Sequence, residues 1–232
     1  MSNIYTFRRI EKKYILNHEQ FIGVTKRIKE HFHLDEHGST RIFNIYFDND
    51  SNELINTSIQ KPVYKEKLRL RSYKEPKDDT EVFLEIKKKY KKVVYKRRIC
   101  LKYKDVLDFL KTGTLTYKKD PHTLNEINYM LKHYKLQPKV HISYLREAYF
   151  SNTDENLRIT FDHDIKSRYT NLNLCEDEAD LPLLKSDTYI MEIKALGSIP
   201  LFLSNILTQE KIYPGSFSKY GNIHKQHIIG GI

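Results

Sequence analysis

The stretch "EKLRLRSY", residues 66–73, alternates strictly between charged and apolar side chains. Successive side chains of a strand point to opposite faces, so Lys67, Arg69 and Arg71 share one face, and Leu68 and Leu70 share the other. The leucine face predicts burial against a core. Solvent-exposed strand faces usually mix Thr, Ser and Gln among their charges, whereas this face carries three cations in succession. The stretch therefore predicts a strand with one buried face and one face that needs counter-charge.

The same alternation recurs along most of the chain, and Arg and Lys dominate the charged rows. These rows are Arg9, Glu11 and Lys13 in "FRRIEKKYIL" (7–16), Glu85, Lys87 and Lys89 in "EVFLEIKKKY" (81–90), Tyr144, Arg146 and Ala148 in "HISYLREAYF" (141–150), Arg158, Thr160 and Asp162 in "LRITFDHDI" (157–165), and Glu192 and Lys194 in "TYIMEIKALG" (188–197). In "VVYKRRICL" (93–101) two readings stay open: either Lys96 and Arg98, or Tyr95 and Arg97, share the row.

Segments rich in β-branched and aromatic residues predict eight strands, enough to close a barrel. They lie near 5–15, 41–48, 64–74, 81–91, 93–103, 139–149, 156–164 and 187–196. Helical spacing predicts three helices: one containing Phe21, Val24, Ile28 and Phe32, one after Pro121, and one near 200–209. The acidic stretch 171–187 predicts a solvated loop. We therefore expect one α+β domain over residues 1–232, with an eight-stranded antiparallel β-barrel.

The sequence is compatible with two arrangements of such a barrel. In the ordinary one, the charged faces lie in water and form cross-strand ion pairs. In the inverted one, helices cover the apolar faces from outside and the charged faces line a tunnel. Unpaired buried cations cost several kcal/mol each, so an inverted barrel requires an anionic ligand. A chain of phosphates with a divalent cation would supply that charge, held by Arg forks and Lys ammonium groups.

Composition agrees with an anionic ligand. The 232 residues carry a net charge of +10, and the sequence pI is about 9.3, which attracts nucleic acid, phospholipid, nucleotides or polyphosphate. Nucleic acid is disfavoured, because no RNP, KH or helix-turn-helix signature is present and the aromatic residues are scattered. Cys100 and Cys175 form neither a disulfide framework nor a zinc motif. With no signal peptide and no apolar run of about 20 residues, a cytoplasmic chain is expected.

Eight short motifs, in order, resemble the VTC (vacuolar transporter chaperone) domain, a polyphosphate polymerase domain. They are "RRIEKKY" (8–14), "IYFDN" (45–49), "KLRLRSY" (67–73), "FLEIKKK" (83–89), "YLREAY" (144–149), "LRITFD" (157–162), "YIMEIK" (189–194) followed by Gly197 and Pro200, and "FSKYG" (217–221). The resemblance implies the eight-stranded tunnel of the triphosphate tunnel metalloenzymes, a CYTH-like superfamily. Tunnel hydrolases of that superfamily begin with E-x-E-x-K, and here Arg9 stands at the first position, as in the polymerase branch.

The resemblance also implies roles for individual residues. It assigns phosphoryl-transfer roles to Lys13, Arg69, Arg71, Arg146, Arg158 and Lys219, and a metal, Mn²⁺ or Mg²⁺, to Glu192 with Glu11 as a second ligand or a partner of the cations. Substrate contacts are expected from Arg9, Lys67, Lys87, Lys89, Lys96, Arg98, Lys194, Ser218 and Tyr144. For "FSKYG" the alternative is a plain carboxy-terminal turn ended by Gly221.

Three functions stay open from the sequence. The first is a polyphosphate polymerase that uses ATP, with inorganic phosphate or polyphosphate as the acceptor. The second is a hydrolase of tripolyphosphate or a nucleoside triphosphate, and the third is a non-catalytic polyphosphate or nucleotide sensor. The family's polymerases work beside membrane subunits, so the resemblance implies a membrane-protein partner as a candidate. Arg9, in place of the first Glu of E-x-E-x-K, disfavours the hydrolase.

Overall fold

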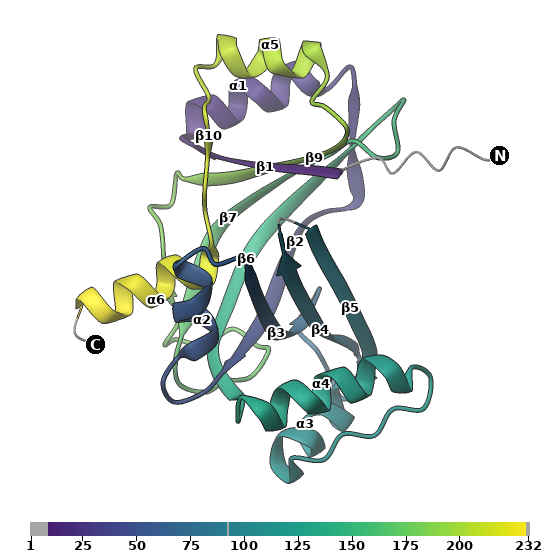
Figure 1. Ribbon diagram of the computed structural model, residues 1–232. Helices are drawn as coiled ribbons and strands as arrows, with labels where there is room; N and C mark the ends of the chain where they lie inside the picture. The colour runs from purple at the N-terminus through teal and green to yellow at the C-terminus, as the bar shows by residue number, and fades with distance from the viewer. Residues whose placement is uncertain (1–8, 92, 231–232) are drawn as a thin grey trace, which may run out of the picture. The chain divides into compact units, whose positions relative to one another are not determined.

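The computed structural model describes residues 9–91 and 93–230, with side chains described for 10–91 and 93–228 (Figure 1). In chain order the elements are β1 (Arg9–Leu16), α1 (His18–Ile28), β2 (Phe32–Asp48), α2 (Glu53–Ile59), β3 (Tyr64–Ser72), β4 (Glu81–Tyr90), β5 (Val93–Lys102), α3 (Tyr103–Thr112), α4 (Pro121–His133), β6 (Gln137–Ser151), β7 (Arg158–Arg168), β8 (Leu181–Pro182), β9 (Tyr189–Leu196), α5 (Leu201–Gln209), β10 (Pro214–Gly215) and α6 (Lys219–Gly230).

Each of the eight predicted strands is present among the described residues, and β8 and β10 add two short ones. Residues 5–8 of the first predicted strand lie outside the described part of the chain. The three predicted helices correspond to α1, α4 and α5, although Phe32 begins β2 instead of ending α1. Helix α1 starts after Asn17, whose side chain accepts from the Gln20 backbone while the Gln20 side chain accepts from the Asn17 backbone, which is a capping box. Helices α2, α3 and α6 were not predicted, and the first two are only 7 and 10 residues long.

The chain divides into two compact units. Unit 1 comprises residues 1–40, 144–165 and 184–218, and unit 2 comprises residues 41–143, 166–183 and 219–232. Strands β2, β6 and β7 each contribute residues to both units. Each unit is described separately below.

Unit 1 packs two helices against one face of its strands. Strand β9 pairs antiparallel with both β1 and β7, and α1 and α5 lie side by side over them (Figure 1). The apolar face of the strands includes Tyr14, Phe161 and Ile193, and it packs against Val24 of α1 and Leu203 of α5. Their burial excludes water from this face, which stabilises the unit through the hydrophobic effect. The charged rows of β1, β7 and β9 therefore lie on the face opposite the helices.

Unit 2 repeats this arrangement with different elements. Leu68 and Leu70 of β3 are fully buried and pack, with the apolar residues of β4 and β5, against Phe109 of α3 and Ile127 and Met130 of α4. The prediction that helices cover the apolar strand faces is thus confirmed in both units. Helix α6 packs beside α2.

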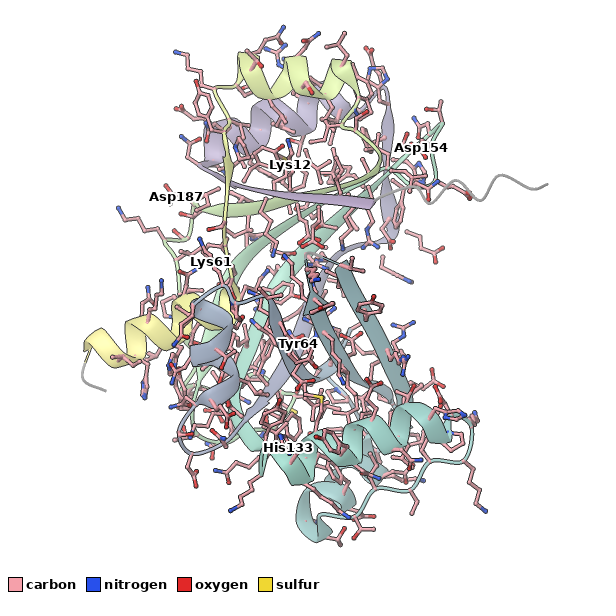
Figure 2. The ribbon with its side chains drawn as sticks, viewed as in Figure 1. Lys12, Lys61, Tyr64, His133, Asp154 and Asp187 are labelled. Carbon is pink, nitrogen blue, oxygen red and sulfur yellow. The ribbon has the colours of Figure 1, made fainter. Side chains whose placement is uncertain are left out.

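On the helix-covered face of unit 2, charged side chains are paired with other protein side chains. Buried Glu66 accepts from the hydroxyl of Tyr64, labelled in Figure 2, at 2.9 Å and from that of Tyr134 at 2.6 Å. Glu126 of α4 holds Lys88 at 2.8 Å and Arg97 at 2.9 Å. These cations on the apolar face are therefore neutralised by protein carboxylates.

The prediction of a closed barrel is wrong for the described residues. Hydrogen-bonded neighbours follow the order β10-β1-β9-β7-β6 in the strands of unit 1 and β6-β2-β3-β4-β5 in those of unit 2, with β8 beside β7. Strands β10 and β5 each have one neighbour in this order, so the antiparallel sheet is open there. Alternation fixes which way side chains point, but closure depends on pairing between strands that are distant in sequence.

The acidic stretch 171–187 is also more ordered than a solvated loop. Leu174 is fully buried, and Arg168 holds the stretch through Asp180 at 2.7 Å, the side chain of Asn173 at 2.7 Å and the Cys175 carbonyl at 2.9 Å. Both cysteines are free. Among the helices of the described part of the chain, none has the length and apolarity that crossing a bilayer requires.

Candidate functional site

The pairing of β3, β4 and β5 gathers cations from three strands on the face opposite α3 and α4. We call this the β3–β5 cation face; its charged members are Lys65, Lys67, Arg69, Arg71, Glu85, Lys87, Lys89, Lys96 and Arg98. The register resolves the ambiguity in β5. Glu85 pairs with Arg98 and Lys87 with Lys96, whereas Arg97 lies on the helix-covered face. Lys65 was missed by the sequence reading, although it continues the row of Lys67.

One cross-strand row of this face contains three lysines. Lys87 lies directly opposite Lys67 on one side and Lys96 on the other. Like charges placed directly opposite each other destabilise a sheet. Lys65 lies in the next row, and the pKa of its ammonium group is lowered. Burial is the largest cause, followed by repulsion from the charges of Lys89, Lys61 and Lys87. The row thus favours a bound anion.

Glu85 is the acid set among these cations. Its side chain is 1% exposed, and its carboxylate lies 2.7 Å from Arg69 Nη2 and 2.8 Å from Lys96 Nζ, with Arg71 Nε at 4.0 Å. Burial alone would raise the pKa of Glu85, but Arg69 and Arg71 more than reverse this effect and lower it to about 2. One fixed negative charge therefore orders three of the predicted phosphate-binding side chains.

Strand β2 supplies two further members that the sequence reading missed. Tyr46 lies directly opposite Arg69 and Asn44 opposite Arg71. Each accepts a hydrogen bond from its arginine, at 3.1 Å for the Tyr46 hydroxyl and 2.9 Å for Asn44 Oδ1. The alternation of Asn44, Tyr46 and Asp48 with apolar neighbours in "FNIYFD" (43–48) was the available signal.

Unit 1 carries the second charged group, which we call the Glu192 cluster: Glu11, Lys13, Arg146, Arg158, Thr160, Asp162, Glu192 and Lys194. The register sets Glu192 opposite Lys13 on β1 and Thr160 on β7, and Lys194 opposite Glu11 and Arg158. Glu192 contacts Lys194 at 2.8 Å and Lys13 at 3.5 Å. Burial raises the pKa of Glu192, and these two lysines more than reverse that effect, so the pKa lies well below its ordinary range.

Arg146 and Asp162 form a bidentate ion pair within the same cluster. Arg146 Nε and Nη2 donate to the two carboxylate oxygens of Asp162 at 2.6 and 2.7 Å. Buried Tyr144 places its ring 5.3 Å from the Arg146 guanidinium carbon, and Phe150 lies 4.8 Å from that of Arg158. Both predicted arginines are therefore held in fixed orientations, Arg146 by a buried carboxylate that its strand partner supplies.

The "FSKYG" segment is not a plain turn. Lys219 begins α6, and Gly221 lies inside this helix and is buried. Tyr220 is 3% exposed and its hydroxyl donates to Asp48 Oδ2 at 3.1 Å, so it anchors the segment in unit 2. In unit 1, the Phe217 carbonyl accepts from Lys13 Nζ at 3.2 Å, next to exposed Ser218. Arg9 belongs to β1, but its side chain lies outside the described residues.

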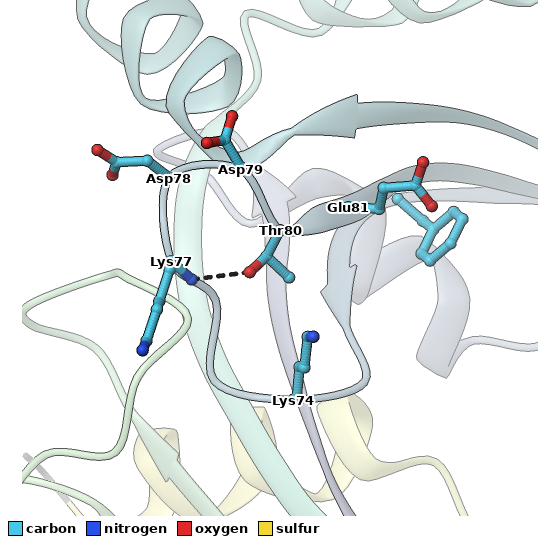
Figure 3. Close-up of a pocket in the computed structure, with 7 residues that line it drawn as sticks. Lys74, Lys77, Asp78, Asp79, Thr80 and Glu81 are labelled. Carbon is cyan, nitrogen blue, oxygen red and sulfur yellow. Dashed lines mark hydrogen bonds between the residues drawn. The ribbon is translucent and has the colours of Figure 1, made fainter.

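The hollow drawn in Figure 3 lies at the β3–β4 turn. Lysine and acidic side chains line it together, and Thr80 Oγ1 accepts from the Lys77 backbone at 2.9 Å (Figure 3). Its mixed charge contrasts with the β3–β5 cation face, so we assign it no phosphate ligand.

A divalent metal fits the Glu192 cluster only with oxygens from a substrate. Among the described residues, no three His, Cys, Asp or Glu side chains are grouped to hold an ion. Glu192 offers a partly buried carboxylate, and the hydroxyl of Thr160 opposite it is buried without a hydrogen-bond partner. Mg²⁺ commonly binds through one or two carboxylates, waters and substrate phosphates, which matches this donor set.

Comparison with known proteins places this geometry in a family. The model of the VTC domain matches residues 8–227, and no curated protein matches the sequence. Among solved structures, a candidate adenylate cyclase from Bacillus halodurans is similar with a TM-score of 0.56 and 16% identity, over 90% of this chain and 93% of that one. Another, from Vibrio parahaemolyticus, has a TM-score of 0.49 and 12% identity over 93% and 97% of the two chains. The first likeness concerns the fold. Because the family model spans nearly the whole sequence, the chain belongs to the VTC domain family.

Proposed function

We propose that this chain is a single polyphosphate polymerase-like domain of the triphosphate tunnel type. It would transfer the γ-phosphate of ATP to a growing chain of inorganic polyphosphate, with a divalent cation. The observation that carries the proposal is the row of Lys67, Lys87 and Lys96, which lie directly opposite one another on three adjacent strands, with Lys96 also contacting Glu85 at 2.8 Å. Family membership supports a phosphate-handling role, and the Arg at position 9 favours the polymerase over the hydrolase.

For phosphoryl transfer, the protein has to position the phosphates and stabilise their negative charge. In phosphoryl transfer, charge spreads over the equatorial oxygens, so catalysis depends on fixed cations. Arg69 and Arg71, held by Tyr46, Asn44 and Glu85, would donate to phosphate oxygens. In the Glu192 cluster, Lys13, Arg146 and Arg158 would do the same.

No protein nucleophile is required. An oxygen of the acceptor phosphate attacks the γ-phosphorus of ATP, the bond from that phosphorus to the β-bridging oxygen breaks, and ADP leaves. Glu192, with Glu11, would hold Mn²⁺ or Mg²⁺, which neutralises phosphate charge when bound. Lys219 and Ser218 would bind the phosphate that is transferred or released. We place this activity in the cytoplasm beside a membrane-protein partner.

The contacts of Glu192 favour a second candidate function, binding without catalysis. The Glu192 carboxylate is already engaged by Lys13 and Lys194, so a metal must compete with two ammonium groups. A chain that binds polyphosphate or nucleotide without turnover is the corresponding alternative.

Incubation of the pure protein with ATP and Mn²⁺, followed by gel analysis for phosphate chains, separates these functions. Long chains that depend on Lys67 and Lys87 support the polymerase. Release of inorganic phosphate alone indicates a hydrolase, and saturable tripolyphosphate binding without turnover indicates a sensor. Arg97→Ala is the matched control, because Arg97 lies on the opposite face of β5 and pairs with Glu126. Absence of both binding and turnover would refute a phosphate-handling role.

A further inference from the structure

Tyr46 is fixed against the arginine pair of the β3–β5 cation face. Arg69 Nη1 donates to its hydroxyl oxygen at 3.1 Å, and the Arg69 guanidinium carbon lies 5.9 Å from its ring. The ring also contacts that of Tyr220, with 5.1 Å between centroids. Since Tyr220 is anchored to Asp48, the phenol of Tyr46 is held from two sides. Its oxygen therefore faces the cations as an acceptor.

The charge around this phenol is strongly positive. Strand β3 contributes Lys67, Arg69 and Arg71, and β4 contributes Glu85. Strand β5 contributes Lys96, which contacts Glu85. The remaining titratable groups are Tyr220 and His224 of α6 and Asp48 of β2. Burial alone raises the pKa of Tyr46, but Arg69, Lys67 and Arg71 outweigh it and lower the pKa to about 7. A phenol so placed changes charge near neutral pH, as few tyrosines do.

We propose that the Tyr46 hydroxyl is the proton-accepting member of the phosphate site. Without ligand and above neutral pH, it stands as a phenolate against Arg69, Lys67 and Arg71. When a phosphate chain binds these cations, its negative charge replaces that of the phenolate, and the oxygen takes up one proton from solvent. The same hydroxyl then acts as a neutral donor or acceptor beside the ligand. This inference rests on the proposed binding of phosphate chains to the β3–β5 cation face.

Proton uptake makes ligand affinity depend on pH in a defined direction. Above neutral pH the phenolate competes with phosphate for the cations, so affinity falls as the pH rises. For one coupled proton the limit is about tenfold for each pH unit. Tyr46→Phe removes the proton-binding group and should flatten this dependence. It should also bind more tightly than wild type at about pH 8.5, because phenylalanine carries no competing charge.

Isothermal titration with tripolyphosphate at about pH 8, in two buffers of different ionisation enthalpy, counts the protons taken up. Wild type should take up close to one proton more than Tyr46→Phe, and Tyr129→Phe, an exposed tyrosine of α4, should match wild type. Tyr129→Phe controls for the loss of a hydroxyl elsewhere, and comparison with Tyr46→Phe cancels the titration of the ligand itself. Equal proton counts in wild type and Tyr46→Phe, with binding intact, would overturn the inference alone. Failure of wild type to bind tripolyphosphate would overturn the proposed function as well.

Wild-type protein alone gives a second measurement that does not depend on the folding of a variant. Tyrosinate has its own ultraviolet absorbance, so the free protein should show a phenol titration near neutral pH. Tripolyphosphate added at about pH 8 should reduce the tyrosinate signal by an amount corresponding to about one residue. An unchanged signal at saturating ligand would refute the assignment.

Discussion

Replacing Glu85 with glutamine tests the charge balance of the cation face most directly. The carboxylate is 1% exposed and contacts Arg69 and Lys96 within 2.8 Å. Its pKa falls from 4.5 to about 2 on folding, and each pKa unit corresponds to about 1.36 kcal/mol. Glu85→Gln should therefore lower the free energy of unfolding at neutral pH by about 3 kcal/mol, within the range for breaking a buried ion pair.

The pH dependence follows from the direction of the shift. Because the pKa of Glu85 is lower in the folded state, its ionised carboxylate stabilises the fold fully above about pH 4.5. This stabilisation is lost as the pH falls toward 2. The difference between wild type and Glu85→Gln should thus shrink from about 3 kcal/mol at neutral pH to about 1.4 kcal/mol at pH 3. Urea unfolding followed by circular dichroism measures it, with exposed Glu155→Gln as the control.

A ligand provides a second check on this variant. If phosphate chains bind the same cations, tripolyphosphate should raise the melting temperature of Glu85→Gln more than that of wild type, because it restores the missing negative charge. Equal stability of the two proteins at neutral pH, within about 0.5 kcal/mol, would contradict the assigned charge balance.

Three further variants test individual assignments. Arg69→Ala should weaken tripolyphosphate binding by about 1.5–3 kcal/mol, the scale of a charge-assisted hydrogen bond; calorimetry with Arg97→Ala as control measures this, and unchanged affinity removes Arg69 from the site. Glu192→Gln should keep phosphate binding and lose metal-dependent turnover, so full turnover at ordinary Mn²⁺ concentrations would place the metal elsewhere. Lys219→Ala should reduce turnover at least tenfold, about 1.4 kcal/mol, with little change in polyphosphate affinity; a truncation is unsuitable because Tyr220 is buried.

Much of the architecture could be predicted because its signals are local. The alternation in "EKLRLRSY" placed Leu68 and Leu70 in the core and Arg69 on the opposite face, as observed. The spacing after Pro121 predicted α4. Helix α3 was missed although Val106 and Phe109 show helical spacing, because this short helix follows β5 directly. Helix α6 was not predicted, because a glycine such as Gly221 is unfavourable inside a helix, whereas here burial of Tyr220 stabilises the helix.

The candidate site was predicted less completely than the strands. Motif matching named the cations, but it missed Tyr46 and Asn44, whose importance comes from the arginines opposite them. Nor did it indicate that Glu85 would serve three cations at once, or that Asp162 would hold Arg146 through two hydrogen bonds.

The sequence by itself determined which face of most strands is charged, because side chains alternate with a period of two residues whatever the strand's neighbours are; in β5 it left two readings, which the register resolved. It also determined that the cations outnumber the acids on those faces. Only the tertiary structure decided the register, which sets Lys67, Lys87 and Lys96 in one row and Tyr46 against Arg69. Over the residues that the structure describes, it likewise left the sheet open at β5 and β10. Register and closure depend on hydrogen bonds between segments far apart in the chain, and no local pattern specifies those partners.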